Sequence, residues 1–169
     1  MTQNNSIDVT TIGNAIVDII AQCNDNFLEE FKIIKASMDL IDEQRSKTLF
    51  DNLEKPKIIS GGSAANTAVG IAALGSKAAF IGKVKNDELG NTFKDDIQKV
   101  GVSFNTALEN DGPRTASSII LVTPDAERSM NTFLGACVNL DVKDLDENLI
   151  KNSKIVYLEG YLFDPPKAK

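Results

Sequence analysis

The sequence contains no histidine and no tryptophan, and its only cysteines are Cys23 and Cys137. Without histidine, a His-based catalytic triad is excluded and a zinc site loses its commonest nitrogen ligand. The two cysteines lie far apart and form no CxxC pair, which is typical of reduced thiols in a cytosolic protein.

Basic residues and long apolar runs are also scarce. The chain carries 18 Lys and Arg against 24 Asp and Glu, giving a net charge of −6. This balance argues against a nucleic-acid partner, because a phosphate backbone needs clustered basic residues. The polar start of the chain lacks the pattern of a signal peptide, and no apolar run approaches the roughly 20 residues that cross a bilayer. We therefore expect a cytoplasmic protein with neither a nucleic-acid nor a membrane partner.

The chain does contain an alternation of short apolar runs with amphipathic segments. Its 169 residues suffice for one domain with its own core. The expected strands cover residues 7–12, 57–60, 78–81 and 155–158, and the expected helices cover 42–53, 63–74 and 88–100. This order predicts a doubly wound α/β fold with a parallel sheet covered on both faces. We expect Ser63 to cap a helix buried on nearly every side, and the last strand to be buried too.

The segment from about 102 to 133 breaks this alternation. Strand-like runs at 102–104, 116–123 and 128–133 follow one another without helices, separated by turn residues. They indicate a small β excursion that serves as a lid or an interface.

Residues 61–66, Gly-Gly-Ser-Ala-Ala-Asn, connect an expected strand to an expected helix. Glycines allow a ligand to approach the backbone, and Asn66 offers both a donor and an acceptor one turn into the helix. The segment fits neither the P-loop nor the GxGxxG pattern. The alternative is a strand-to-helix turn that uses glycine only for packing.

Asp18 closes the segment 13–18, which directly follows the first expected strand. A carboxylate there can accept hydrogen bonds from both hydroxyls of a vicinal diol. The alternative is an aspartate that only stabilises a turn or caps a helix.

These segments resemble the ribokinase/PfkB family of carbohydrate kinases, in its adenosine-kinase-like branch. Residues 61–68 with Gly75 are similar to the family's amino-terminal signature, and 13–18 resemble its first substrate loop. Further similar landmarks lie, in family order, at residues 80–90, 122–136 and 157–161. The resemblance implies a ribokinase-like doubly wound, mostly parallel sheet with a small β lid. Residues 1–169 would be the amino-terminal part of one kinase domain, with lid segments at about 19–41 and 102–133 and the carboxyl-terminal half of the fold missing.

The resemblance also implies which residues bind the substrate. Carried over residue by residue, the substrate contacts would be Asn14, Asp18, Gly61, Gly62, Ser63, Asn66 and Glu159. Arg128 would lie near the transferred phosphate, where a guanidinium can steady developing charge. For Arg128 and Glu159 the alternatives are a solvated hairpin charge and a helix-capping acid.

The sequence departs from the family pattern in three places. Lys85 and Ala36 stand where glycines are common, and no Gly-Ala-Gly-Asp segment, which would supply the anion hole and the general base, occurs. Asn26 and Glu29 fit the spelling of the family's Asn-x-x-Glu motif but precede the substrate loop, so we treat the match as coincidence. ATP and Mg²⁺ are implied for the complete enzyme, while no metal ligand and no catalytic base is expected in this chain.

The implied activity is ATP-dependent phosphorylation of a primary hydroxyl of a sugar or nucleoside, with this chain inactive alone. A second hypothesis is a non-catalytic module that binds a sugar or nucleoside, or that forms a homodimer through the lid. A third is a truncated product that folds poorly.

Overall fold

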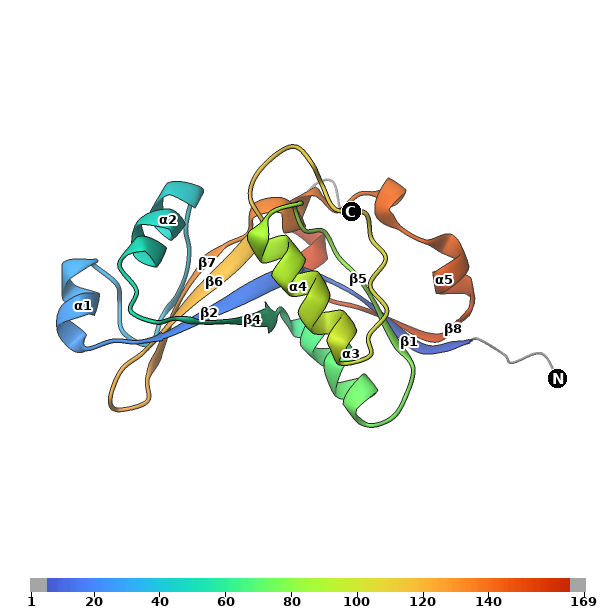
Figure 1. The fold of residues 1–169 in the computed structure, drawn as a ribbon, viewed down its shortest axis with the longest axis horizontal. Helices are drawn as coiled ribbons and strands as arrows, with labels where there is room; N and C mark the ends of the chain where they lie inside the picture. The colour runs from blue at the N-terminus through green and yellow to red at the C-terminus, as the bar shows by residue number, and fades with distance from the viewer. Residues whose placement is uncertain (1–5, 165–169) are drawn as a thin grey trace.

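The structure, a computed structural model, describes residues 6–164, and Figure 1 shows its elements in chain order. The strands are β1 (Ile7–Ile12), β2 (Ile16–Gln22), β3 (Met38–Leu40), β4 (Lys57–Gly61), β5 (Ala78–Ile81), β6 (Ala116–Val122), β7 (Arg128–Phe133) and β8 (Ser153–Leu158). The α-helices are α1 (Asp25–Glu30), α2 (Glu43–Asp51), α3 (Ser63–Ala73), α4 (Glu88–Lys99) and α5 (Glu147–Lys151). The 3₁₀ turns are η1 (Gly135–Asn139), η2 (Val142–Asp144) and η3 (Gly160–Phe163).

The strands form two sheets at opposite ends of the molecule (Figure 1). The first has three parallel strands in the order β5-β1-β8. The second has five strands in the order β3-β7-β6-β2-β4, which we call the lid sheet. In it, β2 pairs with β6 and β3 with β7 in parallel, whereas the other neighbours are antiparallel. The expected parallel sheet and β lid are therefore both present.

The parallel sheet is held by apolar side chains on both faces. All four residues of β5 are buried, as expected for a strand of a covered sheet. Helix α3 packs on β1 and β5 on one face. On the other, Ile12 and Ile81 meet Leu140 and Leu162 from the turns that follow the lid.

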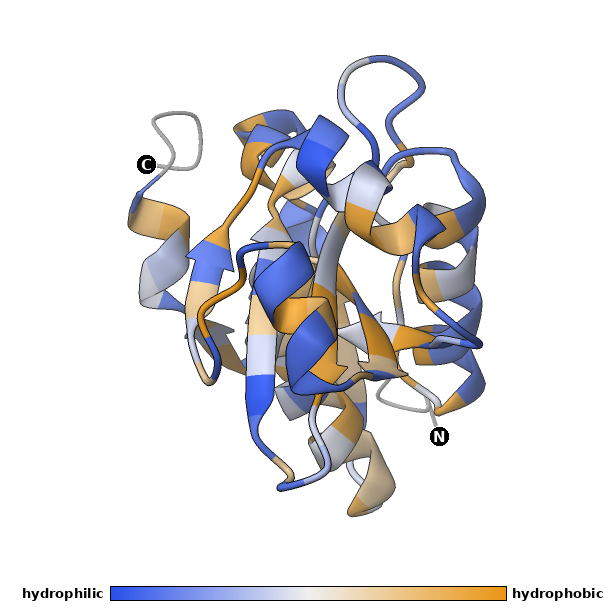
Figure 2. Cartoon of the chain, turned by 90° about the vertical axis from the view of Figure 1, so that its left-hand side faces the viewer, coloured by the Kyte–Doolittle hydropathy of each residue, from blue (hydrophilic) through white to orange (hydrophobic). Residues whose placement is uncertain are grey.

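One apolar core joins this region to the lid sheet. Phe80, Phe93 and Phe104 form an aromatic cluster with ring centroids 5.4–5.8 Å apart. The same cluster of buried residues continues to Val17 and Ile19 on β2. Because alternate residues of a strand point to opposite faces, the other face of the lid sheet is left for a different use. Figure 2, seen from the lid end, shows hydrophilic and hydrophobic residues following each other along these strands.

Helix α3 differs from its prediction in two ways. Its N-cap is Gly62, with φ +92°, rather than Ser63, whose hydroxyl donates to a carboxylate elsewhere. Its buried residues lie on one face, and Leu74 at its end is 87% exposed. The prediction of a helix buried all round was wrong because the apolar composition does not show that only one side of it meets a sheet. Helices α2 and α4 begin as expected, the first behind the predicted cap Asp42.

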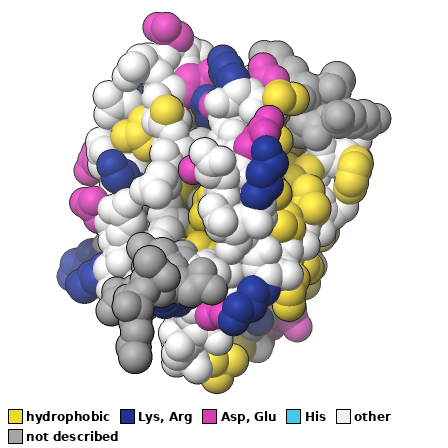
Figure 3. All heavy atoms as spheres, turned by 90° about the vertical axis from the view of Figure 1, so that its right-hand side faces the viewer, with side chains coloured by type: hydrophobic (Ala, Val, Ile, Leu, Met, Phe, Trp, Pro, Cys, Tyr) yellow, Lys and Arg dark blue, Asp and Glu magenta, His cyan; other side chains and the backbone are white. Residues whose placement is uncertain are grey.

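The last strand forms where predicted but is not buried. Ile155, Leu158, Tyr161 and Phe163 on β8 and the turn after it are exposed, because β8 is an edge strand of the parallel sheet. Figure 3 shows hydrophobic side chains gathered along one side of this end of the molecule. Residues 102–104 form no hairpin strand, and Ser103 instead bridges to Ala79 of β5.

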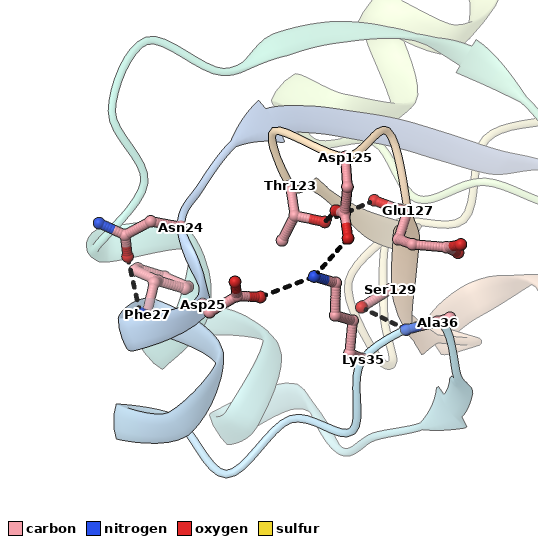
Figure 4. A network of polar contacts seen from close by, with 9 residues as sticks. All are labelled: Asn24, Asp25, Phe27, Lys35, Ala36, Thr123, Asp125, Glu127 and Ser129. Atoms are coloured by element: carbon pink, nitrogen blue, oxygen red, sulfur yellow. Dashed lines mark hydrogen bonds and ion pairs between the residues drawn. The ribbon is translucent and has the colours of Figure 1, made fainter.

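A polar network ties the segment before β3 to the turn between β6 and β7 (Figure 4). Lys35 Nζ lies 2.8 Å from Asp25 Oδ1 and 2.7 Å from Asp125 Oδ2. The next residue, Ala36, has φ +60° and donates its N–H to Ser129 Oγ over 3.0 Å. Left-handed backbone favours glycine, so the alanine carries local strain.

Among residues 6–164, no helix is long and apolar enough to cross a membrane.

Candidate ligand-binding site

A hollow of about 470 Å³ lies between the lid sheet and the first turn of α3. Its lining brings together five residues that the sequence singled out: Asn14, Asp18, Gly62, Ser63 and Asn66. The other lining residues are Ile16, Met38, Leu40, Ser118, Met130, Thr132, Leu134, Tyr161 and Asp164. Segments far apart in the sequence therefore meet at one place, as the family resemblance implied.

The register of the lid sheet explains this lining. Asp18 pairs with Ser118, Ser118 with Thr132, and Thr132 with Leu40, so one row crosses four strands. Paired residues point to the same face, so all four side chains face the hollow. The Ser118 and Thr132 hydroxyls are 2.9 Å apart in the middle of this row. The row runs from a carboxylate at one end to an apolar side chain at the other.

Asp18 lies against the backbone of Gly61, which pairs with Ile16 and therefore stands diagonally opposite Asp18 on β4. A Cβ at Gly61 would be 2.3 Å from Asp18 Oδ2, a distance that no side chain tolerates. Gly61 itself does not line the hollow; it makes the space that lets the carboxylate turn into it. Partial burial raises the pKa of Asp18 above its ordinary value.

Gly62 turns the chain from β4 into α3 beside Asn14. A Cβ there would be 2.4 Å from the Asn14 carbonyl oxygen, and the φ of +92° also requires glycine. In the described part of the chain, Asn14 Oδ1 is buried without a hydrogen-bond partner. Such an atom is costly unless a ligand or water satisfies it.

The opposite wall of the hollow is apolar. Met38 and Leu40 of β3 are 60% and 64% exposed, and Met130 and Leu134 stand beside them. Exposed apolar side chains that line a hollow are typical of a binding surface. The sequence interpretation missed this wall. Met38 and Leu40, which alternate with Asp39, were a sequence signal for a strand with one apolar face. Their position at the hollow, however, depends on the pairing of β3 with β7.

Glu159 lies elsewhere than expected. It is 8% exposed, does not line the hollow, and accepts a hydrogen bond from Ser63 Oγ at 2.5 Å. It therefore reaches the hollow through Ser63 and not by direct contact.

Arg128 is exposed at the start of β7, where it pairs with Val122 next to the hairpin turn. The structure does not bring it to the hollow. Its expected contact with a phosphate therefore stays a prediction.

Within residues 6–164, no group of three or more acidic, Cys or His side chains could hold a metal ion. The polar and apolar walls of the hollow match a small organic ligand that has both kinds of surface.

The topology defines a ribokinase-like α/β fold with a β lid. The chain belongs to the PfkB family: the pfkB family carbohydrate kinase domain matches residues 31–168.

Solved structures agree in fold along nearly the whole chain. An adenosine kinase from Sinorhizobium meliloti is 53% identical with a TM-score of 0.87, covering 96% of this chain and 50% of that one. A probable sugar kinase from Rhizobium etli CFN 42 is 50% identical with a TM-score of 0.87, covering 96% and 49%. A Schistosoma mansoni adenosine kinase in complex with adenosine shares the fold, with a TM-score of 0.82 at 22% identity, covering 95% and 49%.

Curated relatives include sugar kinases. A 5-dehydro-2-deoxygluconokinase from Clostridium perfringens is 35% identical over 103 residues, 59% of this chain and 30% of that protein. A probable chloroplastic fructokinase from Arabidopsis thaliana is 36% identical over 99 residues, 57% of this chain and 26% of that protein. The chain thus spans about half the length of the solved kinases, and its matched part covers less than a third of these curated relatives.

Proposed function

We propose that this chain is the substrate-binding half of a kinase that transfers a phosphoryl group from ATP to the primary hydroxyl of a nucleoside. The observation that carries the proposal is the row across the lid sheet, with Asp18 at one end and Leu40 at the other. A nucleoside has the matching asymmetry, because its ribose is rich in hydroxyls and the flat faces of its base are apolar. The adenosine kinase of Sinorhizobium meliloti, at 53% identity, supports this choice.

In this proposal each wall has a separate task. The carboxylate of Asp18 accepts hydrogen bonds from the two ribose hydroxyls, and Asn66 completes the polar contacts from α3. Met38, Leu40 and Met130 cover the base and exclude water, which fixes the ligand for reaction. Gly61 and Gly62 give the room that these positions need.

The transfer step itself is proposed for a protein that contains more than this chain. ATP would supply the phosphoryl group and Mg²⁺ would offset its charge, as phosphoryl transfer generally requires. This sequence has no Gly-Ala-Gly-Asp segment, and thus neither the general base nor the anion hole that the family resemblance implies. We therefore propose that the chain alone binds a nucleoside but does not phosphorylate it, with Arg128 as a phosphate contact in the complete enzyme.

A free sugar is the second candidate substrate. The polar wall alone would suit it, and the curated relatives include sugar kinases. The exposed apolar residues of β3 would then have no ligand group to cover.

Two further proposals concern the setting of the protein. The two cysteines, which lie far apart and form no CxxC pair, support a cytoplasmic location, because thiols stay reduced there. The edge position of β3 in the lid sheet supports a homodimer through the lid, since an unpaired strand edge can accept another strand. Light scattering after size exclusion would test the dimer, which a monomeric mass at high concentration would contradict.

Titration calorimetry on the purified chain tests the proposed substrate. Adenosine should bind at least about tenfold more tightly than ribose or fructose, because covering the base buries apolar surface worth about 25 cal/mol per Å². Equal affinity for ribose would favour the sugar alternative, and no binding of either would contradict the proposal. With ATP and Mg²⁺ added, formation of AMP by this chain would contradict the proposed lack of catalysis.

A further inference from the structure

Glu159 is a buried carboxylate whose contacts are unusual for its burial. It stands at the end of β8 and, in the described part of the chain, takes part in no salt bridge. Its nearest polar partner is Ser63, whose Oγ lies 2.5 Å from Oε2. The Tyr157 hydroxyl lies 3.5 Å from Oε1. Burying a carboxylate without a charged partner costs free energy. The presence of Glu159 at this position therefore needs an explanation.

Glu159 lies beside the hollow, where the ends of β1, β4 and β8 come together. A Cβ at Gly13, directly after β1, would be 3.4 Å from Glu159 Oε2, so the carboxylate is fitted against this glycine. Ser63 begins α3 directly after β4 and its turn. Glu159 also precedes η3, and its carbonyl accepts the N–H of Leu162, while Tyr161 of the same turn lines the hollow. The carboxylate of Glu159 is therefore held between the end of β1, the start of α3 and the turn η3, and residues of α3 and η3 line the hollow.

The hydrogen bond between these two residues fixes the direction of the Ser63 hydroxyl. A carboxylate only accepts hydrogen bonds, so the single proton of Ser63 must be donated to Glu159. The hydroxyl oxygen then has only lone pairs left for the hollow that Ser63 lines. Serine, which can ordinarily donate or accept, becomes an acceptor toward any ligand here.

Two other residues that line the hollow near Ser63 also present hydrogen-bond acceptors. The carboxylate of Asp18 only accepts, and Asn14 Oδ1 is a buried acceptor without a partner in the described residues. These three acceptors, on Ser63, Asp18 and Asn14, match a ligand edge that carries several O–H or N–H donors. They disfavour a ligand edge made of acceptors, because buried lone pairs would then face each other.

We propose that Glu159 is a positioning residue that holds the Ser63 hydroxyl as a hydrogen-bond acceptor, so that this wall selects ligands presenting a donor to it. The inference deepens the proposed nucleoside-binding function and rests on it. The donor is a ribose hydroxyl or the exocyclic amino group of a base. Ser63 contacts the ligand, whereas Glu159 acts only through Ser63.

Replacing Glu159 with glutamine should weaken the selection of donor-bearing ligands while keeping the size and shape of the side chain. A glutamine side chain can donate as well as accept, so the Ser63 proton is no longer committed to residue 159. Glu159→Gln should therefore weaken discrimination against ligands that lack the donor. Ser63→Ala should do the same by removing the hydroxyl, and the double variant should lose no more discrimination than Ser63→Ala alone.

The experiment is calorimetry with adenosine, 2′-deoxyadenosine, 3′-deoxyadenosine and inosine on the whole chain. The readout is the ratio of each analogue's Kd to that of adenosine, which a general loss of structure would not change selectively. In the unmodified chain at least one analogue should bind about tenfold more weakly, because a lost hydrogen bond leaves the site's polar groups unpaired. Glu159→Gln and Ser63→Ala should each lower that ratio about threefold or more, while Ser63→Thr, which keeps the hydroxyl, preserves it. Glu30→Gln, an exposed acid on α1, is the matched control and should leave every ratio unchanged.

The outcomes separate the inference from the proposed function. If the unmodified chain binds no nucleoside, the proposed function and the inference both fail. If it binds adenosine but Ser63→Ala leaves every ratio unchanged, the inference alone fails. The same holds if Ser63→Ala changes a ratio that Glu159→Gln does not. Should Glu159→Gln fail to fold in thermal melts, the Ser63→Ala and Ser63→Thr ratios still decide whether Ser63 selects a donor.

Discussion

The parallel sheet and the lid sheet contribute to the hollow in different ways. The parallel sheet lines the hollow with no strand residue and contributes only through residues just beyond its strands: Asn14 after β1 lines the hollow, and Glu159 after β8 acts through Ser63. The lid sheet offers an entire face, with Asp18, Ser118 and Thr132 in one row. The polar groups at strand ends are fixed by close backbone packing, whereas the face of the lid is set by strand register.

The polar and apolar walls of the hollow depend on different features of the fold. Glycines at positions 61 and 62 bring the backbone close enough to position the polar groups. The apolar wall depends on β3, a three-residue edge strand tied to the rest of the lid by pairing with β7 and by exposed ion pairs. We expect changes to the polar wall to have large effects on binding and changes to the apolar wall and its supporting ion pairs to have smaller ones.

The largest effect is expected at Asp18. Asp18→Asn should weaken adenosine binding about 100-fold or more, because hydrogen bonds to a charged group contribute about 1.5–3 kcal/mol each. In the unmodified chain, binding should also weaken as the pH falls through the pKa of Asp18, which burial raises above 3.8. Calorimetry at several pH values measures both effects. Asp95→Asn, an exposed aspartate on α4, is the control, and an equal loss there would contradict a specific role for Asp18.

Gly61→Ala tests whether close packing positions the polar wall. The new Cβ would be 2.3 Å from Asp18 Oδ2, so the carboxylate must move and adenosine affinity should fall about tenfold or more. Gly70→Ala is the matched control, since a Cβ on that helical glycine meets nothing within 4 Å. The control should keep affinity and raise the free energy of unfolding by about 0.5–1 kcal/mol. Unchanged affinity in Gly61→Ala would show that the Asp18 position does not matter.

Leu40→Ser tests the apolar wall. Because Leu40 is 64% exposed, the fold should tolerate the change, while adenosine affinity should fall about three- to tenfold through lost apolar contact. Ribose affinity should stay the same, since the sugar contacts lie at the other end of the row. Leu74→Ser, which changes another exposed leucine that does not line the hollow, should change neither affinity. A parallel loss of ribose affinity would mean that the two walls do not act separately.

The smallest effect is expected for the ion pairs of the lid. The hydrogen bond from Lys35 lowers the pKa of Asp125 to about 2, and the Asp125 side chain is exposed. Its contribution to stability is therefore present above the ordinary pKa of 3.8 and is lost as the pH falls from there to about 2. Lys35 stays charged over this range, because its own pKa is raised.

Melting temperatures of the unmodified chain and of Lys35→Met, measured across this pH range, check the prediction. The variant should melt slightly lower near neutral pH, and the difference should shrink in acid and in high salt. Lys47→Met is the control, because it removes an exposed ion pair within α2 and leaves the Lys35–Asp125 pair in place. The difference in melting temperature between this variant and the unmodified chain should not show the pH dependence that comes from Asp125. A difference in melting temperature that does not shrink as the pH falls from about 4 to about 2 would contradict the assignment.

Local patterns in the sequence predicted most of the elements. The apolar stripe of residues 88–100 gave α4, and Asp42 caps α2 as expected, because both depend on neighbouring residues alone. The family signature also predicted that Asp18, Gly62 and Asn66 would meet, and they line one hollow. Their contacts with a substrate remain predictions.

Features that depend on distant partners could not be predicted. The exposure of β8 and of the outer side of α3 follows from what packs against them, which composition does not reveal. The link from Glu159 to Ser63 spans 96 residues. The apolar wall depends on the pairing of β3 with β7, and a three-residue strand carries too little pattern to be recognised.

The central claim is that one ligand occupies both walls of the hollow at once, and NMR chemical-shift mapping tests it most directly. With adenosine, the account predicts shifts in the amides of Gly62, Ser63 and Asn66 together with the methyl groups of Leu40 and Met130. With ribose, only the amides should shift. Adenosine shifts confined to one wall, or clustered outside the hollow, would contradict the account.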